Sequence, residues 1–225
     1  MHGNKNNITL LRFAMVDLTQ TNREILGRTY ADFLLLGVTS VELAILFPLT
    51  PAFGVADWIY VLQHVLVLGV AVARQPPQRR DHSLPASVAV VVAYAYSYAQ
   101  VAWLKWTPGE AAWPDGGLAL LTFAALLSLA SLLSLGKRFG VRPALRGLMT
   151  RGPYRLVRHP MYLAYVLADI GYNLEEWNMG TALLVMAGWA SLLYRIHAEE
   201  RMLASDPGWP SYVASVRHRL IPGVW

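Results

Sequence analysis

A succession of long apolar runs, separated by short polar loops, is the feature that most constrains this chain. An α-helix needs about 20 apolar residues to cross the hydrocarbon core of a bilayer. The apolar runs occupy residues 30–49, 55–73, 84–104, 117–136, 161–174 and 178–194. Because 55% of the residues are hydrophobic and only 15% are charged, the composition also favours a membrane protein over a soluble one.

The last two runs are shorter than the others and leave the number of spans open. At 1.5 Å per residue they reach about 21 and 26 Å, which is less than the roughly 30 Å of a bilayer core. We expect them to form a tight helical hairpin that turns at residues 175–177. The fold class predicted is therefore all-α, a polytopic integral membrane helix bundle with five to six transmembrane helices. An N-terminal cytosolic or interfacial segment (1–29) precedes four membrane helices (30–136) and a C-terminal region (137–225).

The basic residues indicate how the bundle is oriented. Of the 19 Lys and Arg residues, 18 lie before residue 30 or within 74–83, 137–160 and 195–225, which leaves only Lys105 in an opposite-side loop. By the positive-inside rule, both termini and these basic segments face the cytosol, in a bacterial inner membrane or the endoplasmic reticulum. Membrane orientation explains the net charge of +5 better than nucleic-acid binding does, so we expect no nucleic-acid partner.

A polar insert at residues 151–162 interrupts the apolar pattern. Proline disfavours helical angles in the residue before it and is favoured at the first helical position, so a helix should begin at Pro160 with His159 at its entrance. Helix N-termini attract anions, and Arg158 and His159 add hydrogen-bond donors there. We interpret these two residues as a site for a carboxylate or phosphate. The other arginines of the insert are interpreted as anchors at the membrane surface.

A second polar cluster, residues 197–201, follows the last apolar run. The spacing of Arg195 and Glu199 by four residues is typical of a solvated helix face with weak ion pairs. An inward carboxylate would instead bind an ammonium group or ribose hydroxyls. Consecutive residues point about 100° apart around a helix. At most one of Glu199 and Glu200 is therefore expected to lie squarely on the inward face.

Ionisable residues that stand deep inside apolar runs are costly and are usually functional or paired. Glu42 and His64 come to similar depths of adjacent spans, so a buried pair is expected, either as a structural clasp or as a substrate contact. Asp169 lies nearer the two polar clusters and is a candidate for facing a substrate cavity.

Several familiar sites are excluded by what the sequence lacks. Without cysteine there are no disulfides, thiolate metal ligands or cysteine nucleophiles. The six histidines are too scattered for a metal site, and no H-E-x-x-H motif occurs. The chain has neither the G-x-G-x-x-G fingerprint of dinucleotide-binding domains nor the G-x-S-x-G elbow of serine hydrolases.

Three blocks in the last third of the chain resemble one enzyme family. The run from Gly152 to Tyr162 is similar to the R-H-P-x-Y signature of isoprenylcysteine carboxyl methyltransferases, a group that includes membrane phospholipid N-methyltransferases. Glu199-Glu200 resembles the acidic pair of the group. Tyr212 and the end Arg219-Leu220-Ile221-Pro222-Gly223 resemble its Y…R-x-I-P-G terminus. The resemblance covers about residues 150–225.

The resemblance implies an integral membrane methyltransferase that uses S-adenosylmethionine, with residues 137–225 as a cytosol-facing, cofactor-binding catalytic region. The residues it implies as cofactor contacts are Arg158, His159, Tyr162, Glu199 and Glu200. Cationic donors suit the methionine carboxylate of the cofactor, and a glutamate suits its ammonium group or ribose. The implied acceptor is lipid-like or otherwise amphiphilic, such as a prenylcysteine carboxylate. Its candidate contacts are Glu42, His64 and Asp169.

Other functions fit the same sequence. Within the group, the acceptor is alternatively a phospholipid amine or a small thiol. Membrane reductases of the steroid 5α-reductase kind have a similar R-H-P-x-Y pattern and would use NADPH. A transporter or membrane scaffold would instead use Glu42, His64 and Asp169 to line a path. Because methyl transfer from a sulfonium depends mainly on holding the reacting atoms in line, no catalytic triad is expected for the methyltransferase.

Overall fold

The computed structural model describes residues 37, 40, 55–73, 79–140 and 142–225, and this part of the chain is mostly helical. Its helices are α2 (Val55–Ala73), α3 (Leu84–Trp106), α4 (Pro114–Leu135), α5 (Pro160–Glu175), α6 (Met179–Leu203) and α7 (Trp209–Ser215), with short 3-10 turns η1 (Gly136–Arg138) and η2 (Gly152–Arg155). The apolar run at 30–49 lies outside the described residues, apart from two isolated positions.

Proline stands in the first turn of four of these helices, α3, α4, α5 and α7. Its ring fixes φ near the helical value, and its missing N–H is one that the first turn leaves unbonded in any case. Pro114 and Pro160 open α4 and α5, and Pro85 stands in the first turn of α3. Ser83 also caps α3, because its hydroxyl accepts a hydrogen bond from the backbone N–H of Ala86.

Three helices in the described part of the chain are long and apolar enough to cross a membrane: Leu84–Leu104, Pro114–Arg138 and Met179–Leu203. Large apolar side chains are exposed along them, among them Val91, Leu133, Leu183 and Met186. An apolar outer surface is typical of a helix that faces lipid. The chain is therefore a helical membrane protein.

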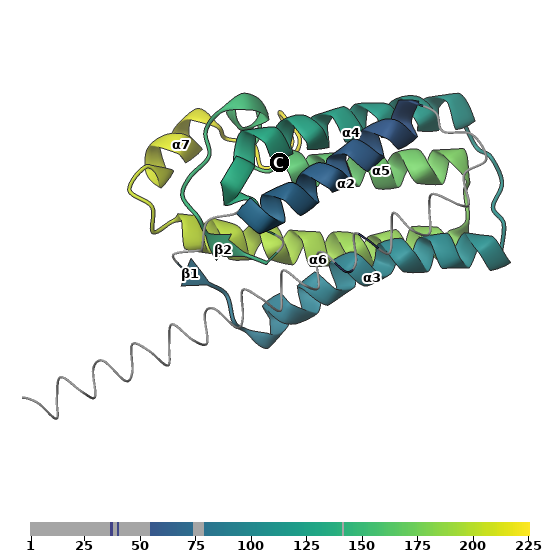
Figure 1. Ribbon diagram of the computed structural model, residues 1–225, viewed down its shortest axis with the longest axis horizontal. Helices are drawn as coiled ribbons and strands as arrows, with labels where there is room; N and C mark the ends of the chain where they lie inside the picture. Colours follow the sequence, from purple (N-terminus) through teal and green to yellow (C-terminus); the bar gives the residue numbers. More distant parts are fainter. Residues whose placement is uncertain (1–36, 38–39, 41–54, 74–78, 141) are drawn as a thin grey trace, which may run out of the picture.

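The main helix pairs are α4 with α5 and α3 with α6, not the hairpin that the sequence predicts. α4 packs against α5 and α2, whereas α3 packs against α6 (Figure 1). The expected tight hairpin of 161–174 and 178–194 is therefore wrong in its packing. α5 and α6 are consecutive, but each has its main contact with another helix.

Glycines explain these partnerships, because small residues let two membrane helices approach closely. A Cβ atom added at Gly171 of α5 would lie 2.9 Å from Cγ of Leu121 in α4. A Cβ atom added at Gly188 of α6 would lie 2.8 Å from ring atoms of Tyr96 in α3. The close contacts of α5 with α4 and of α6 with α3 thus depend on positions that have no side chain.

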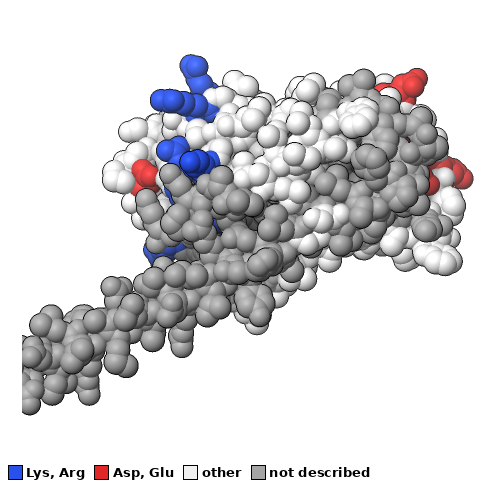
Figure 2. Space-filling view, in the orientation of Figure 1, with Lys and Arg blue, Asp and Glu red and all other residues white. Residues whose placement is uncertain are grey.

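Basic residues gather at one end of the bundle. There the short strand β1 (Arg79–Arg80) pairs antiparallel with β2 (Ala144–Leu145), which joins the loop before α3 to the loop after α4. In the view of Figure 2, Lys and Arg lie at this end and most Asp and Glu at the opposite end. At that opposite end, Glu110 and Trp177 form an isolated backbone bridge between two loops.

Candidate functional site

The N-terminus of α5 is built as the sequence predicts. Pro160 is the first residue of the helix and His159 is its N-cap. The backbone N–H of Arg158 donates to the carbonyl of His218 at 2.9 Å, and that of His159 donates to the carbonyl of Arg219 at 2.9 Å. The C-terminal tail, residues 216–225, therefore runs beside the loop that leads into α5.

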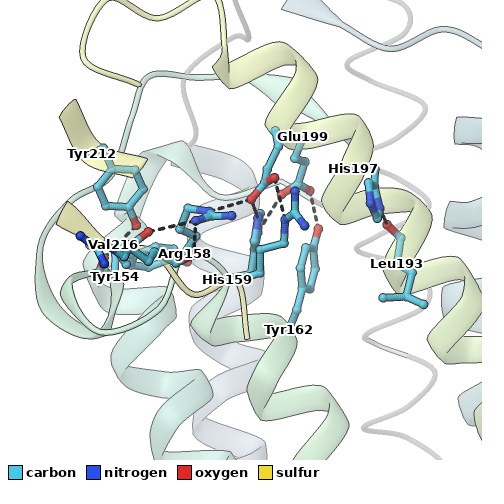
Figure 3. A network of polar contacts seen from close by, with 12 residues as sticks. Tyr154, Arg158, His159, Tyr162, Leu193, His197, Glu199, Tyr212 and Val216 are labelled. Atoms are coloured by element: carbon cyan, nitrogen blue, oxygen red, sulfur yellow. Dashed lines mark hydrogen bonds and ion pairs between the residues drawn. The ribbon is translucent and has the colours of Figure 1, made fainter. Parts of the chain in front are cut away.

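The acidic pair lies on α6. This helix continues to Leu203, so both glutamates stand in its last turns, beside the start of α5. The expectation that at most one of Glu199 and Glu200 faces inward is wrong. Both carboxylates take part in the cluster, because partners surround this end of α6 on two sides (Figure 3). Tyr162 of α5 donates a hydrogen bond to Glu199, while Arg158 donates one to Glu200.

Glu200 is the centre of a dense ion-pair network. Its Oε1 accepts a hydrogen bond from Nε of Arg158 at 2.7 Å and lies 3.3 Å from Nε2 of His159. Its Oε2 accepts from Nε of Arg219 at 2.9 Å. Hydrogen bonds between ionised partners are about twice as strong as neutral ones. Glu200 thus joins α6, the entrance of α5 and the tail.

Arg158 is buried and is also engaged by the tail. Its NH1 group donates to the carbonyls of Val216 at 3.0 Å and Arg217 at 2.7 Å, in addition to the bond from its Nε to Glu200. A guanidinium presents five donors in a planar fork, which suits it to several fixed acceptors at once. The Arg158 contacts that the structure describes are therefore made to the protein itself.

Glu199 is the more accessible of the two carboxylates. It accepts a hydrogen bond from the hydroxyl of Tyr162, and its Oε2 lies 3.9 Å from Nδ1 of His159. The His159 ring stacks on that of Tyr162, with ring centroids 5.6 Å apart. The Glu199 side chain is 22% exposed, compared with 11% for Glu200.

Two arginines of the cluster were not among the predicted site residues. Arg195 was expected on a solvated face, but it is only 7% exposed, and its guanidinium carbon lies 4.9 Å from the centroid of the Tyr162 ring. Arg219 contacts Glu200, and its guanidinium lies 5.1 Å from the ring centroid of Trp225. The available signals were the four-residue spacing of Arg195 from Glu199 and the Arg219 position in the terminal motif.

The helix α7 is tied to the turn η2 at the edge of the cluster. The hydroxyl of Tyr212 donates to the backbone carbonyl of Tyr154 at 2.8 Å. Burial raises the pKa of Tyr212 to about 12, so the hydroxyl stays protonated and acts as a donor throughout the physiological range. This bond fixes the segment that leads into the tail.

Asp169, one of the three candidates inside apolar runs, is not brought into the charged cluster. Asp169 is buried in α5, where its carboxylate accepts from Nε1 of Trp189 at 2.8 Å and from the hydroxyl of Tyr96 at 3.3 Å. It therefore links α5 to α6 and α3. His64 is partly buried on α2, which packs against α4. Glu42 lies outside the described residues, so its pairing with His64 stays a prediction.

Residues 117–205, which run from α4 to just beyond α6, match the model of the isoprenylcysteine carboxyl methyltransferase family. The family resemblance is confirmed. The part of the chain that matches this methyltransferase family includes the start of α5 and both glutamates. The tail with Arg219 lies after the matched residues. No curated protein is significantly similar to the chain. The match and the apolar helices together support a membrane methyltransferase.

Proposed function

We propose that the chain is an integral membrane methyltransferase that uses S-adenosylmethionine, bound where α5 begins, α6 ends and the tail crosses. The observation that carries the proposal is the charged cluster. Arg158 and Glu200 are 42 residues apart in the sequence, yet they are joined at 2.7 Å inside the segment that matches the family. His159, Tyr162 and Glu199 complete the set that the family resemblance implies as cofactor contacts.

The residues present fit the chemical groups of this cofactor. Glu199, which is partly exposed, suits the ammonium group or the ribose hydroxyls. The first turn of α5 has backbone N–H groups without helical acceptors, which suits the carboxylate. The bound cofactor supplies an electrophilic methyl group, and the role of this chain is to hold it in line with the acceptor.

The acceptor we propose is amphiphilic, with a prenylcysteine carboxylate as the leading candidate. The charged cluster adjoins a buried apolar cluster of Tyr162, Leu192, Ile196 and Leu220, so charged and apolar side chains lie next to each other here. An acceptor that keeps an apolar tail in the bilayer would present its polar end here. A carboxylate nucleophile needs no general base, which agrees with a site that holds charges rather than a catalytic triad.

We further propose five to six spans, with both termini and the site in the cytosol. The basic segments that the structure describes lie at the cluster end of the bundle, which favours the cytosol for that end. Trp103, Trp106 and Trp113 are exposed at the opposite end, as expected of an interfacial aromatic belt. The localisation that follows is a bacterial inner membrane or the endoplasmic reticulum.

Incorporation of a labelled methyl group tests the function. The purified protein is incubated with methyl-labelled S-adenosylmethionine and, in separate reactions, a prenylcysteine analogue, phospholipid vesicles and small thiols. We expect label in the prenylcysteine analogue, as an ester that mild base releases. Label in lipid or thiol alone would reassign the acceptor within the group. No transfer to any acceptor, together with oxidation of NADPH in the presence of an unsaturated steroid or lipid ketone, would favour the reductase.

A further inference from the structure

The C-terminal tail forms part of the site rather than lying apart from it. Two of its carbonyls, those of His218 and Arg219, accept the backbone N–H groups of Arg158 and His159. Its Leu220 side chain is buried in the apolar cluster beside Tyr162. The backbone of the Arg158-His159 pair is therefore held in place by a segment about 60 residues later in the chain.

One side-chain contact fixes this arrangement to α6. Arg219 extends from the tail to Oε2 of Glu200, while Oε1 of Glu200 is occupied by Arg158 and His159. Both oxygens of Glu200 thus have partners within the chain, and the carboxylate is 11% exposed. Such a group serves to position its neighbours, whereas the more exposed Glu199 is available to a ligand.

We propose that the tail is a strap that completes the cofactor site, and that Arg219 is a positioning residue that acts through Glu200. Glu200 likewise positions Arg158 and His159, so Glu199 is the carboxylate that contacts the cofactor. This proposal rests on the proposed function, because it concerns how the same site is assembled.

The physical argument starts from the charges. Without Arg219, one oxygen of Glu200 loses its ionised partner. The tail then keeps its backbone bonds, the hydrogen bonds from the Arg158 guanidinium to the carbonyls of Val216 and Arg217, and the apolar contact of Leu220. A charge-assisted hydrogen bond contributes more than a neutral one, so its loss weakens the docking of the tail. Arg219 is 29% exposed and its guanidinium also faces the Trp225 ring, so it holds the outer part of the tail. Lysine has no planar fork for both contacts and should replace it only in part.

Arg219→Gln is the test variant, Arg219→Lys the conservative one and Arg217→Gln the matched control. The side chain of Arg217 is exposed, and its contact with Arg158 is made by its backbone carbonyl, which the substitution keeps. Affinity for S-adenosylhomocysteine is measured by calorimetry on full-length protein in detergent, KM and kcat by methyl transfer, and amide hydrogen exchange by mass spectrometry.

For Arg219→Gln we expect affinity to fall about tenfold or more and KM for the cofactor to rise accordingly, while kcat at saturation stays within about threefold of the parent. The amides of Arg158 and His159, which donate to the tail, should exchange faster. Arg219→Lys should be intermediate, and Arg217→Gln should match the parent. Unchanged affinity and unchanged exchange in Arg219→Gln would overturn the proposal.

A double-mutant cycle then tests whether Arg219 acts through Glu200. In a Glu200→Gln background, Arg219→Gln should change affinity by less than about twofold, because the shared interaction is already removed. Independent, multiplying effects would overturn the positioning role. If the parent binds no cofactor at all, the proposed function fails. The amide exchange of Arg158 and His159 then still decides whether Arg219 straps the tail to the bundle.

Discussion

At the scale of single residues, Glu199 and Glu200 are adjacent but have different surroundings. Glu200 accepts hydrogen bonds from two arginines and lies beside a histidine. Glu199 accepts one hydrogen bond, from a tyrosine hydroxyl, and its side chain is twice as exposed as that of Glu200. The Glu200 carboxylate, with both oxygens bonded to arginines, contributes to stability. A carboxylate with exposed surface is able to contribute to binding.

This difference predicts different profiles for two variants. Glu199→Gln should weaken binding of S-adenosylhomocysteine about tenfold with little change in melting temperature. Glu200→Gln should lower the melting temperature as well, because it leaves Arg158 and Arg219 without a counter-charge, at a cost of about 1.5 to 3 kcal/mol for each charged hydrogen bond. Calorimetry and thermal unfolding in detergent provide the two measurements. Equal losses of affinity and of stability in both variants would contradict the division of roles.

The members of the site that the sequence predicted are those whose local pattern is distinctive. The Arg158-His159-Pro160 motif predicts where a helix begins, because proline restricts the backbone angles. The structure confirms that α5 begins at Pro160. Arg195 and Arg219 escaped prediction because their roles depend on what faces them. Helical spacing indicates which residues share a face, but only tertiary packing brings Tyr162 over Arg195, or the tail over Glu200.

At the scale of elements, the lengths of the apolar runs indicated where helices lie but not which helices pack together. The runs at 55–73 and 84–104 correspond to α2 and to most of α3. The partners of α5 and α6 follow instead from glycine positions and from buried hydrogen bonds such as those of Asp169. Such contacts join residues distant in the sequence, so periodicity within one segment does not contain them.

The contact of α3 with α6 gives a prediction about stability. In Gly188→Val the new side chain would overlap the Tyr96 ring and displace the hydroxyl that donates to Asp169. Overpacking of this kind costs about 1 to 3 kcal/mol, which lowers the melting temperature of a protein of this size by several degrees. Ala187→Val, at an exposed position on the same helix, is the control and should unfold like the parent. Equal melting temperatures for both variants would show that α3 and α6 are not so closely packed.

At the scale of the whole molecule, the gathering of basic residues at one end of the bundle predicts the orientation in the membrane. The chain has no cysteine, so single-cysteine variants can be labelled without background. In intact cells of a bacterial host, with the outer membrane permeabilised, an impermeant maleimide should label Ala111→Cys, at an exposed position of the loop before α4. It should label Ala214→Cys, on α7, only after lysis. The reverse pattern would place the charged cluster away from the cytosol that supplies the cofactor.

The central claim is that the charged cluster binds S-adenosylmethionine, and thermal unfolding with ligands tests it most directly. A ligand at 100 times its dissociation constant stabilises the native state by about 2.7 kcal/mol. S-adenosylhomocysteine should therefore raise the melting temperature of the purified protein in a saturable manner, with a smaller rise for Glu199→Gln at the same concentration, while NADPH has no effect. Stabilisation by NADPH and not by S-adenosylhomocysteine would contradict the account.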